Sequence, residues 1–207
     1  MAYRANFSAR RDEVEAIRKS AAVLGTMPMD EDIARVLIAE DVIERRLGVL
    51  AQRIEVAFQG EPELQVVAIL KGALVFMADL LRQVPLPLEI ECINVASYHG
   101  GTESSGVVSF LDKRLPEVKG RPVLVVDDIL DTGRTLAAVK KELLAAGAAG
   151  VKTCVLLTKD RPREIEVEAD FSAFEIGDEF VVGYGLDYQG RYRNLPYVGV
   201  LKPEVFA

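Results

Sequence analysis

From residue 64 onward, continuous apolar runs alternate with segments whose apolar residues recur every three or four positions. Continuous runs of this length predict buried strands, and the three-to-four spacing predicts helices with one apolar face. The strands predicted from such runs are Leu64–Leu70, Val123–Val126 and Val151–Leu157, and Leu88–Ala96 is a further strand-like stretch. The predicted helices between them are Ala73–Val84 and Thr135–Ala146, with Gly147 as the end signal of the second. Strands that are apolar throughout are typical of a parallel sheet covered on both faces.

Two further helices are predicted before the first strand, over Arg10–Leu24 and Glu40–Phe58. The tail from Asp170 onward is aromatic and without clear periodicity, so we predict irregular structure there. Together these patterns predict an α/β fold, an open, mostly parallel twisted sheet with helices on both faces. The length of 207 residues favours a single domain, 1–207, in which about the first 35 residues form an N-terminal helical extension.

Composition and charge narrow the possible functions. Asp and Glu number 32 against 25 Lys and Arg, and a net charge of -7 disfavours binding to a phosphate backbone. No apolar stretch reaches the roughly 18 residues of a membrane helix, and the N-terminal region lacks the apolar core of a secretory signal. We therefore expect a cytoplasmic protein with no nucleic-acid or membrane partner. Cys92 and Cys154 lie in apolar runs, so we expect two buried free thiols.

The most informative stretch is 123–135, VLVVDDILDTGRT. Asp127 and Asp128 follow an apolar strand, and the carboxyl ends of strands are where open α/β sheets bind ligands. The amides from Asp131 onward would point outward at a helix N-terminus, and Gly133 permits close approach of an anion. Carboxylates beside a phosphate cradle would repel a bare anion, so they suit sugar hydroxyls or a divalent cation. The stretch predicts a sugar-phosphate site, and an ordinary strand, Asp cap and helix is the structural alternative.

Through all 13 positions this stretch resembles the phosphoribosyl pyrophosphate motif of the type I phosphoribosyltransferases. Further blocks resemble the hypoxanthine-guanine phosphoribosyltransferases, and the resemblance covers about residues 36–206. These blocks are ILKG at Ile69–Gly72, SYHGG at Ser97–Gly101, LLTKDRP at Leu156–Pro162 and FVVGYGLDYQGRYRNLPYVGVL at Phe180–Leu201. The family implies a small hood built from N- and C-terminal segments, with about residues 160–207 contributing the purine-binding part.

The resemblance also implies a reaction. In this family a nitrogen of a 6-oxopurine, hypoxanthine or guanine, displaces pyrophosphate from phosphoribosyl pyrophosphate and gives IMP or GMP. It implies Mg²⁺ as cofactor, small-molecule substrates as partners, and a homo-oligomer that is a dimer or a tetramer. It further implies a non-proline cis peptide before Lys71.

The family's functional residues carry over by position. Asp131 is the implied catalytic residue, which manages the proton at the reacting purine nitrogen. The implied ligands of phosphoribosyl pyrophosphate are Lys71, Gly72, Ser97, Tyr98, Asp127, Asp128, Thr132, Gly133, Thr135 and Arg193. The implied purine-binding residues are Lys159, Phe180, Val181 and Asp187. Asp187 is the implied Mg²⁺ ligand, with Asp127 and Asp128 as further candidates. The family usually has Glu at position 127, so the shorter Asp127 implies a looser or water-bridged ribose contact.

Other interpretations of these residues remain open. A protein of the same fold could sense nucleotides and regulate RNA or DNA without catalysis, although the negative net charge argues against it. Taken alone, Phe180 and Val181 would be strand core, Asp187 a turn residue and Lys71 a surface lysine, and only the accompanying motifs favour binding roles. We interpret His99, in the polar loop after Tyr98, as a lid residue and not as a general acid.

Overall fold

The computed structural model of the chain describes residues 28–97, 108–111 and 115–206. The predicted helix Arg10–Leu24 and the loop that contains His99 lie outside these residues. The chain forms two compact units. The larger is Arg35–Val200, and the smaller combines, among the described residues, 28–34 with 201–206.

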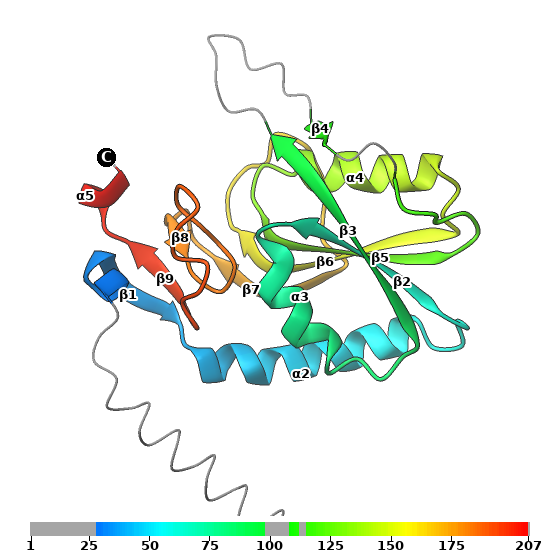
Figure 1. Cartoon of the computed structure of the whole chain (residues 1–207), viewed down its shortest axis with the longest axis horizontal. Coiled ribbons are helices and arrows are strands. Elements are labelled where there is room, and N and C mark those ends of the chain that lie inside the picture. The colour runs from blue at the N-terminus through cyan, green and yellow to red at the C-terminus, as the bar shows by residue number, and fades with distance from the viewer. Residues whose placement is uncertain (1–27, 98–107, 112–114, 207) are drawn as a thin grey trace, which may run out of the picture. The chain divides into compact units, whose positions relative to one another are not determined.

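A six-stranded sheet with the order β4-β3-β2-β5-β6-β7 forms the centre of the larger unit (Figure 1). Its strands are β2 Leu64–Leu70, β3 Leu88–Ser97, β4 Val108–Phe110, β5 Pro122–Leu130, β6 Gly150–Lys159 and β7 Phe171–Ile176. Every neighbouring pair is parallel except β3 and β4. The register places Ala68 opposite Cys92 on one side and opposite Val126 on the other. The predicted mostly parallel sheet is confirmed.

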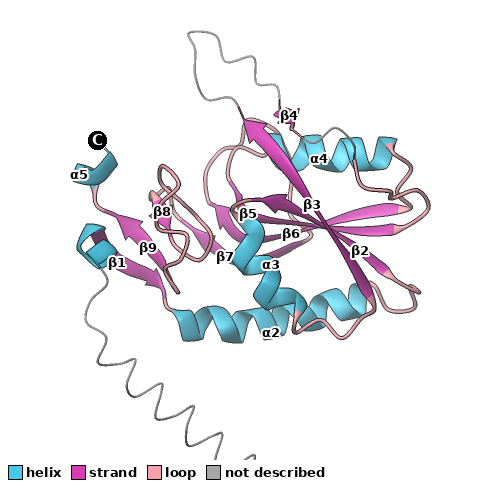
Figure 2. Ribbon diagram, viewed as in Figure 1, coloured by secondary structure: helices cyan, strands magenta, loops and turns pink. Residues whose placement is uncertain are grey.

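Helices cover both faces of this sheet (Figure 2). The helices α2 Glu40–Ala57 and α3 Ala73–Leu81 share one hydrophobic cluster with Val66 and Leu124. The helix α4 Arg134–Ala145 shares a second cluster with Val67 and Val125. Successive strand residues point to opposite faces, so a strand that is apolar at every position fills both clusters.

The helices follow their predicted positions closely. Helix α2 buries the stripe Ile43, Leu47, Leu50, Ala51 and Ile54, whose spacing of three or four defines its inner face. Helix α3 ends at Leu81, three residues before the predicted end at Val84. Helix α4 starts at Arg134, after Gly133 with a φ of 82°, and Gly147 follows its end with a φ of 91°. Positive φ is the conformation that glycine adopts without steric cost.

Some sequence-based expectations were wrong. The tail after Asp170 is not irregular, because it forms β7 and two strands of a second sheet. That three-stranded sheet has the order β1-β9-β8, with β1 Ile33–Ile38, β8 Val181–Val182 and β9 Val198–Leu201. The role of this sheet as the implied hood stays a prediction. Cys154 is a buried free thiol as expected, but Cys92 is exposed on β3.

In the smaller unit, the short helix η1 Pro28–Asp32 and the short helix α5 Pro203–Phe206 are described. The Lys202 N–H donates a hydrogen bond of 2.9 Å to the carbonyl of Asp32, which joins the two ends of the described chain. None of the helices in the described parts of the chain has the length and apolarity that crossing a membrane requires.

The inner face of α2 provides a stability test. Ile54 is fully buried, whereas Val56 on the same helix is 73% exposed. We expect Ile54→Ala to lower the free energy of unfolding by about 2–5 kcal/mol, because it leaves a cavity under the sheet. Val56→Ala, the matched control, should change it by less than about 0.5 kcal/mol. Urea denaturation measures both, and equal effects would contradict this assignment of the core.

Candidate active site

A cleft with a volume of about 330 Å³ lies at the carboxyl ends of the adjacent strands β2 and β5. Most of the predicted site residues line it, although they come from segments far apart in the chain. The nominated residues that line it are Lys71, Gly72, Asp127, Asp128, Asp131, Thr132, Gly133, Thr135, Asp187 and Arg193. These residues therefore gather at the edge of the sheet where open α/β folds bind ligands, and their role in binding the donor stays a prediction.

Asp127 and Asp128 lie inside β5, which runs to Leu130 and is longer than the predicted run. Asp127 is only 6% exposed, and its Oδ1 accepts a hydrogen bond of 3.0 Å from the Asp128 N–H. Burial, together with the negative charge of Asp128, raises the pKa of Asp127 well above its ordinary value. Burial also raises the pKa of Asp128. Two carboxylates in this setting favour a ligand that brings hydroxyl donors or positive charge.

The turn after β5 leads directly into helix α4. A Cβ atom at Gly133 would lie 2.5 Å from the Ile165 carbonyl oxygen, so the turn requires glycine for space as well as for its positive φ. The Thr132 hydroxyl accepts a 3.5 Å hydrogen bond from the Arg134 N–H. Gly133 has no side chain to cap the helix, which leaves N–H groups of its first turn to bind an anion.

The loop after β2 forms the opposite wall of the cleft. The peptide between Leu70 and Lys71 is cis, as the family resemblance implied. A Cβ atom at Gly72 would lie 1.7 Å from the Asp128 Oδ2, so the backbone of Gly72 packs directly against that carboxylate. A Cβ atom at Gly185 would lie 2.2 Å from the Gly72 carbonyl oxygen, so a second backbone approaches from the other side.

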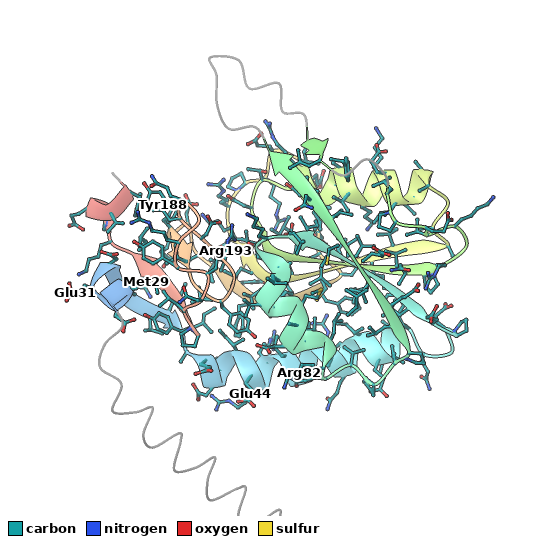
Figure 3. The ribbon with its side chains drawn as sticks, viewed as in Figure 1. Met29, Glu31, Glu44, Arg82, Tyr188 and Arg193 are labelled. Atoms are coloured by element: carbon teal, nitrogen blue, oxygen red, sulfur yellow. The ribbon has the colours of Figure 1, made fainter. Side chains whose placement is uncertain are left out.

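The segment between β8 and β9 supplies the last wall. The Arg193 guanidinium donates through Nη1 to the Gly185 carbonyl at 2.6 Å, and its Nη2 lies 2.6 Å from the Asp187 Oδ1. The Gly190 N–H donates to the other oxygen of Asp187 at 2.7 Å. Figure 3 labels Arg193 on the side of this segment that faces the six-stranded sheet. Arg193 and Asp187 therefore enter the cleft as an ordered ion pair.

Other nominated residues do not line this cleft. Lys159 is the last residue of β6, and its Nζ lies 3.4 Å from the Asp178 Oδ1. Phe180 contacts Tyr188 edge to face with ring centroids 5.6 Å apart, and Val181 is buried in β8 opposite Val200. Their roles in purine binding stay predictions.

The last two nominated residues concern the loop after β3. Ser97 is the final residue of β3, and Tyr98 lies outside the described residues. Their predicted contacts with the donor therefore stay predictions.

The sequence did not nominate Arg161 and Asp178, yet both pair with nominated residues. The Arg161 Nε lies 2.7 Å from the Asp131 Oδ1, and its Nη1 lies 3.1 Å from the Asp178 Oδ1. A charged side chain in a loop gives no sign in the sequence of which distant charge it will meet. Only the fold reveals these pairs.

The carboxylates at the cleft offer only part of a metal site. Across residues 28–97, 108–111 and 115–206, no three or more His, Cys, Asp or Glu side chains group to hold a metal ion. Mg²⁺ in phosphate-transferring sites is commonly held by one or two carboxylates, with substrate oxygens and water completing the shell. Asp187 at the cleft wall and the buried pair Asp127 and Asp128 fit such a partial set of ligands.

Comparisons with known proteins agree with this geometry. The model of the phosphoribosyl transferase domain matches residues 40–189. Over 179 residues the chain is 44% identical to the hypoxanthine-guanine phosphoribosyltransferase of Streptococcus pneumoniae, which covers 86% of this chain and 99% of that protein. A crystal structure of a hypoxanthine phosphoribosyltransferase from Staphylococcus aureus has a TM-score of 0.83 at 40% identity, over 88% of this chain and 98% of that one.

A third relative is longer. The bifunctional protein TilS/HprT of Listeria monocytogenes is 43% identical over 206 residues, which is 100% of this chain but 32% of that protein. The chain thus spans about a third of the length of this relative. The chain belongs to the phosphoribosyltransferase family. Within that family, similar proteins include hypoxanthine-guanine phosphoribosyltransferases, and similar solved structures include hypoxanthine phosphoribosyltransferases.

The close approach of Gly72 to Asp128 provides a test of the site. We expect Gly72→Ala to weaken the binding of phosphoribosyl pyrophosphate about tenfold or more, because the new methyl group must displace the carboxylate. Gly150→Ala is the matched control, since no atom lies within 4 Å of its added Cβ. Titration calorimetry measures donor affinity, and wild-type affinity in Gly72→Ala would contradict the packing described.

Proposed function

We propose that the chain is a hypoxanthine-guanine phosphoribosyltransferase of purine salvage. It transfers the 5-phosphoribosyl group from phosphoribosyl pyrophosphate to a 6-oxopurine, giving IMP or GMP and pyrophosphate. One observation carries the proposal: a carboxylate pair of which Asp127 is buried, the N-terminus of helix α4 and a lysine-glycine loop line the same cleft. A ribose with a phosphate at one end and a pyrophosphate at the other requires these three kinds of contact.

The donor would lie across this cleft. Asp127 and Asp128 accept hydrogen bonds from the ribose hydroxyls, which satisfies two carboxylates that burial otherwise disfavours. Thr132, Gly133 and Thr135 hold the 5'-phosphate through hydroxyl and amide groups at the start of α4. The pyrophosphate lies against Lys71, the Gly72 backbone and Arg193, whose guanidinium matches phosphate geometry. Ser97 and Tyr98 begin the loop that would close over the reacting carbon.

Magnesium belongs to this proposal. Asp187 would hold the ion together with oxygen atoms of the donor, and Asp127 and Asp128 lie at the same cleft. When bound, Mg²⁺ supplies positive charge that stabilises the departing pyrophosphate. Arg193, already paired with Asp187, keeps that carboxylate oriented toward the cleft.

The purine would bind beside the donor. Lys159 donates a hydrogen bond to the purine O6, and a charged donor at that atom favours 6-oxopurines over adenine. Phe180 stacks on the base, the Val181 main chain contacts its edge, and Asp187 accepts from its exocyclic group. Asp131 accepts the proton from the reacting nitrogen as that nitrogen bonds to the ribose carbon. The three-stranded sheet β1-β9-β8 would then act as the hood over the base.

Cytoplasmic location and assembly as a dimer or tetramer are further parts of the proposal, as the family resemblance implied. The regulatory alternative without catalysis has no observation in its favour, and the relatives named above are enzymes. Size-exclusion chromatography with light scattering tests the assembly.

The activity is tested with purified protein, phosphoribosyl pyrophosphate, Mg²⁺ and one base at a time, while nucleotide formation is followed. We expect IMP from hypoxanthine or GMP from guanine, little product from adenine, and loss of activity when EDTA removes Mg²⁺. No nucleotide from hypoxanthine, guanine or xanthine would overturn the proposed function.

Asp131→Asn tests the proton acceptor. Because the amide keeps the shape but loses the basicity, we expect kcat to fall about 100-fold or more while donor affinity changes little. Steady-state kinetics with hypoxanthine and calorimetry with the donor measure the two effects. A kcat equal to that of the wild type would remove Asp131 from this role.

Lys159→Ala tests the contact with O6. We expect kcat/KM for hypoxanthine to fall roughly tenfold or more, since a charged hydrogen bond to the base is lost. Lys152→Ala on the same strand is the matched control, because its ammonium faces Asp170 at 4.0 Å and lies outside the cleft lining. If Lys159→Ala chiefly lowers the melting temperature, the placement of Lys159 at the purine is wrong.

A further inference from the structure

We propose that Arg161 is a positioning residue for Asp131. We further propose that Asp178 is a second anchor, a carboxylate that holds Arg161 and Lys159 by pairing with both. The proposal rests on the proposed function and names residues that the reaction requires in addition to those above. It would mean that the proton acceptor and the O6 donor are held by one connected chain of charges.

The chain of charges runs through four side chains. The Arg161 Nε lies 2.7 Å from the Asp131 Oδ1, and the Arg161 Nη1 lies 3.1 Å from the Asp178 Oδ1. The same oxygen of Asp178 lies 3.4 Å from the Lys159 Nζ. Asp131 comes from the turn between β5 and α4, and Lys159 from the end of β6, so the chain joins two neighbouring strands of the sheet.

The segment that carries Arg161 is itself fixed to the phosphate-binding turn. The Ile165 N–H donates to the Thr132 carbonyl at 3.1 Å, and the Ile165 carbonyl oxygen lies 2.5 Å from where a Cβ of Gly133 would be. Glu164 forms an ion pair with Arg134 in the first turn of α4. Arg161 is therefore not a side chain on a free loop, because its own backbone segment is attached to the turn that it contacts.

The other end of the segment is fixed as well. The Asp160 N–H donates to the Ile176 carbonyl at 2.8 Å, at the end of β7. Asp178 follows β7 by two residues, so this hydrogen bond holds the loop from β6 close to the anchor carboxylate. Contacts at both ends limit the positions that the Arg161 guanidinium can take.

The chemistry of the guanidinium fits this position. Its planar group carries several N–H donors in a fixed arrangement, so it can meet two carboxylates at once. Arg161 contacts Oδ1 of Asp131, which leaves Oδ2 to accept the proton of the purine nitrogen. The Asp131 side chain is 36% exposed and that of Arg161 35%, so solvent screens the pair and its contribution to stability is small. Orientation of the carboxylate is the effect that we expect to matter.

Asp178 has a related role toward Lys159. The Lys159 side chain is only 12% exposed, and Asp178 is its ion-pair partner. The hydrogen bond from Lys159, with the charges of Lys159 and Arg161, lowers the pKa of Asp178, so this carboxylate stays ionised at neutral pH. An ionised Asp178 keeps the ammonium at the edge of the sheet before a base arrives.

A kinetic double-mutant cycle tests the first link. We expect Arg161→Gln to lower kcat for hypoxanthine about fivefold or more, with the KM for phosphoribosyl pyrophosphate within about twofold of the wild type. In an Asp131→Asn background the same substitution should cause no further fall, because the group that Arg161 positions can no longer accept a proton. A structural role would lower activity equally in both backgrounds.

The controls separate positioning from loss of surface charge. Arg45→Gln breaks an exposed ion pair of 2.9 Å with Asp41 on α2, outside the cleft lining, and should leave kcat unchanged. Arg161→Lys keeps the charge but cannot bridge both carboxylates, so it should keep the melting temperature of the wild type and only part of its kcat. An unchanged or raised kcat in Arg161→Gln, or equal falls in both backgrounds, would overturn the proposal.

Asp178→Asn tests the second link. It removes the charge that holds both Lys159 and Arg161, so we expect the KM for hypoxanthine to rise about threefold or more while donor affinity is unchanged. Wild-type kinetics in this variant would overturn the role of Asp178 as the second anchor. A wild-type protein that forms no nucleotide would defeat the proposed function itself, whereas an active wild type with an unaffected Arg161→Gln would defeat this inference alone.

Discussion

The burial of two adjacent carboxylates at the end of a central strand is the constraint on which the rest of the site depends. Asp127 is almost fully enclosed, and burial raises the pKa values of both acids. Such a pair is unfavourable without partners, and backbone N–H groups and the charge of Arg193 only partly offset the cost of burial. A ligand that brings hydroxyl groups, with a cation nearby, relieves this situation. The chemistry of the site thus suits a polyhydroxylated ligand better than an apolar molecule.

The scaffold explains why such a pair can exist. Two helices on one face and one on the other hold β5 in the middle of the sheet, with apolar residues filling both sides up to Val126. Asp127 and Asp128 interrupt this apolar pattern, which resumes at Ile129 and Leu130 before the strand ends. From there the turn into α4 and the loop after β2 meet at one edge, because parallel strands bring their carboxyl ends together. The fold concentrates the chemistry where the packed layers end.

Sequence reasoning succeeded where the signal was local or continuous. The buried strands and the helices α2 and α4 follow from apolar runs and spacing, and the turn at residues 131–133 follows from its glycine and its acids. It failed for the exposure of Cys92, for β7 and the small sheet, and for one set of ion pairs. Strand β7 and the small sheet were missed because β7 mixes polar with apolar residues and β8 is only two residues long. The pairing of Arg161 with Asp131 and Asp178 was missed because it depends on three segments that only the folded chain brings together.

The two glycines that meet back to back at the wall of the cleft have a wider consequence. Gly72 packs on Asp128, and Gly185 packs on the Gly72 carbonyl, with no room for a methyl group at either place. One of these loops would hold the leaving group, and the other carries the acid proposed for the metal. Saturation mutagenesis of Gly72 and Gly185 should therefore find non-additive effects on activity. A larger residue at either position would displace the backbone at the other. Substitutions in the loop of Gly185 that are chosen to change base preference would therefore also change affinity for the donor.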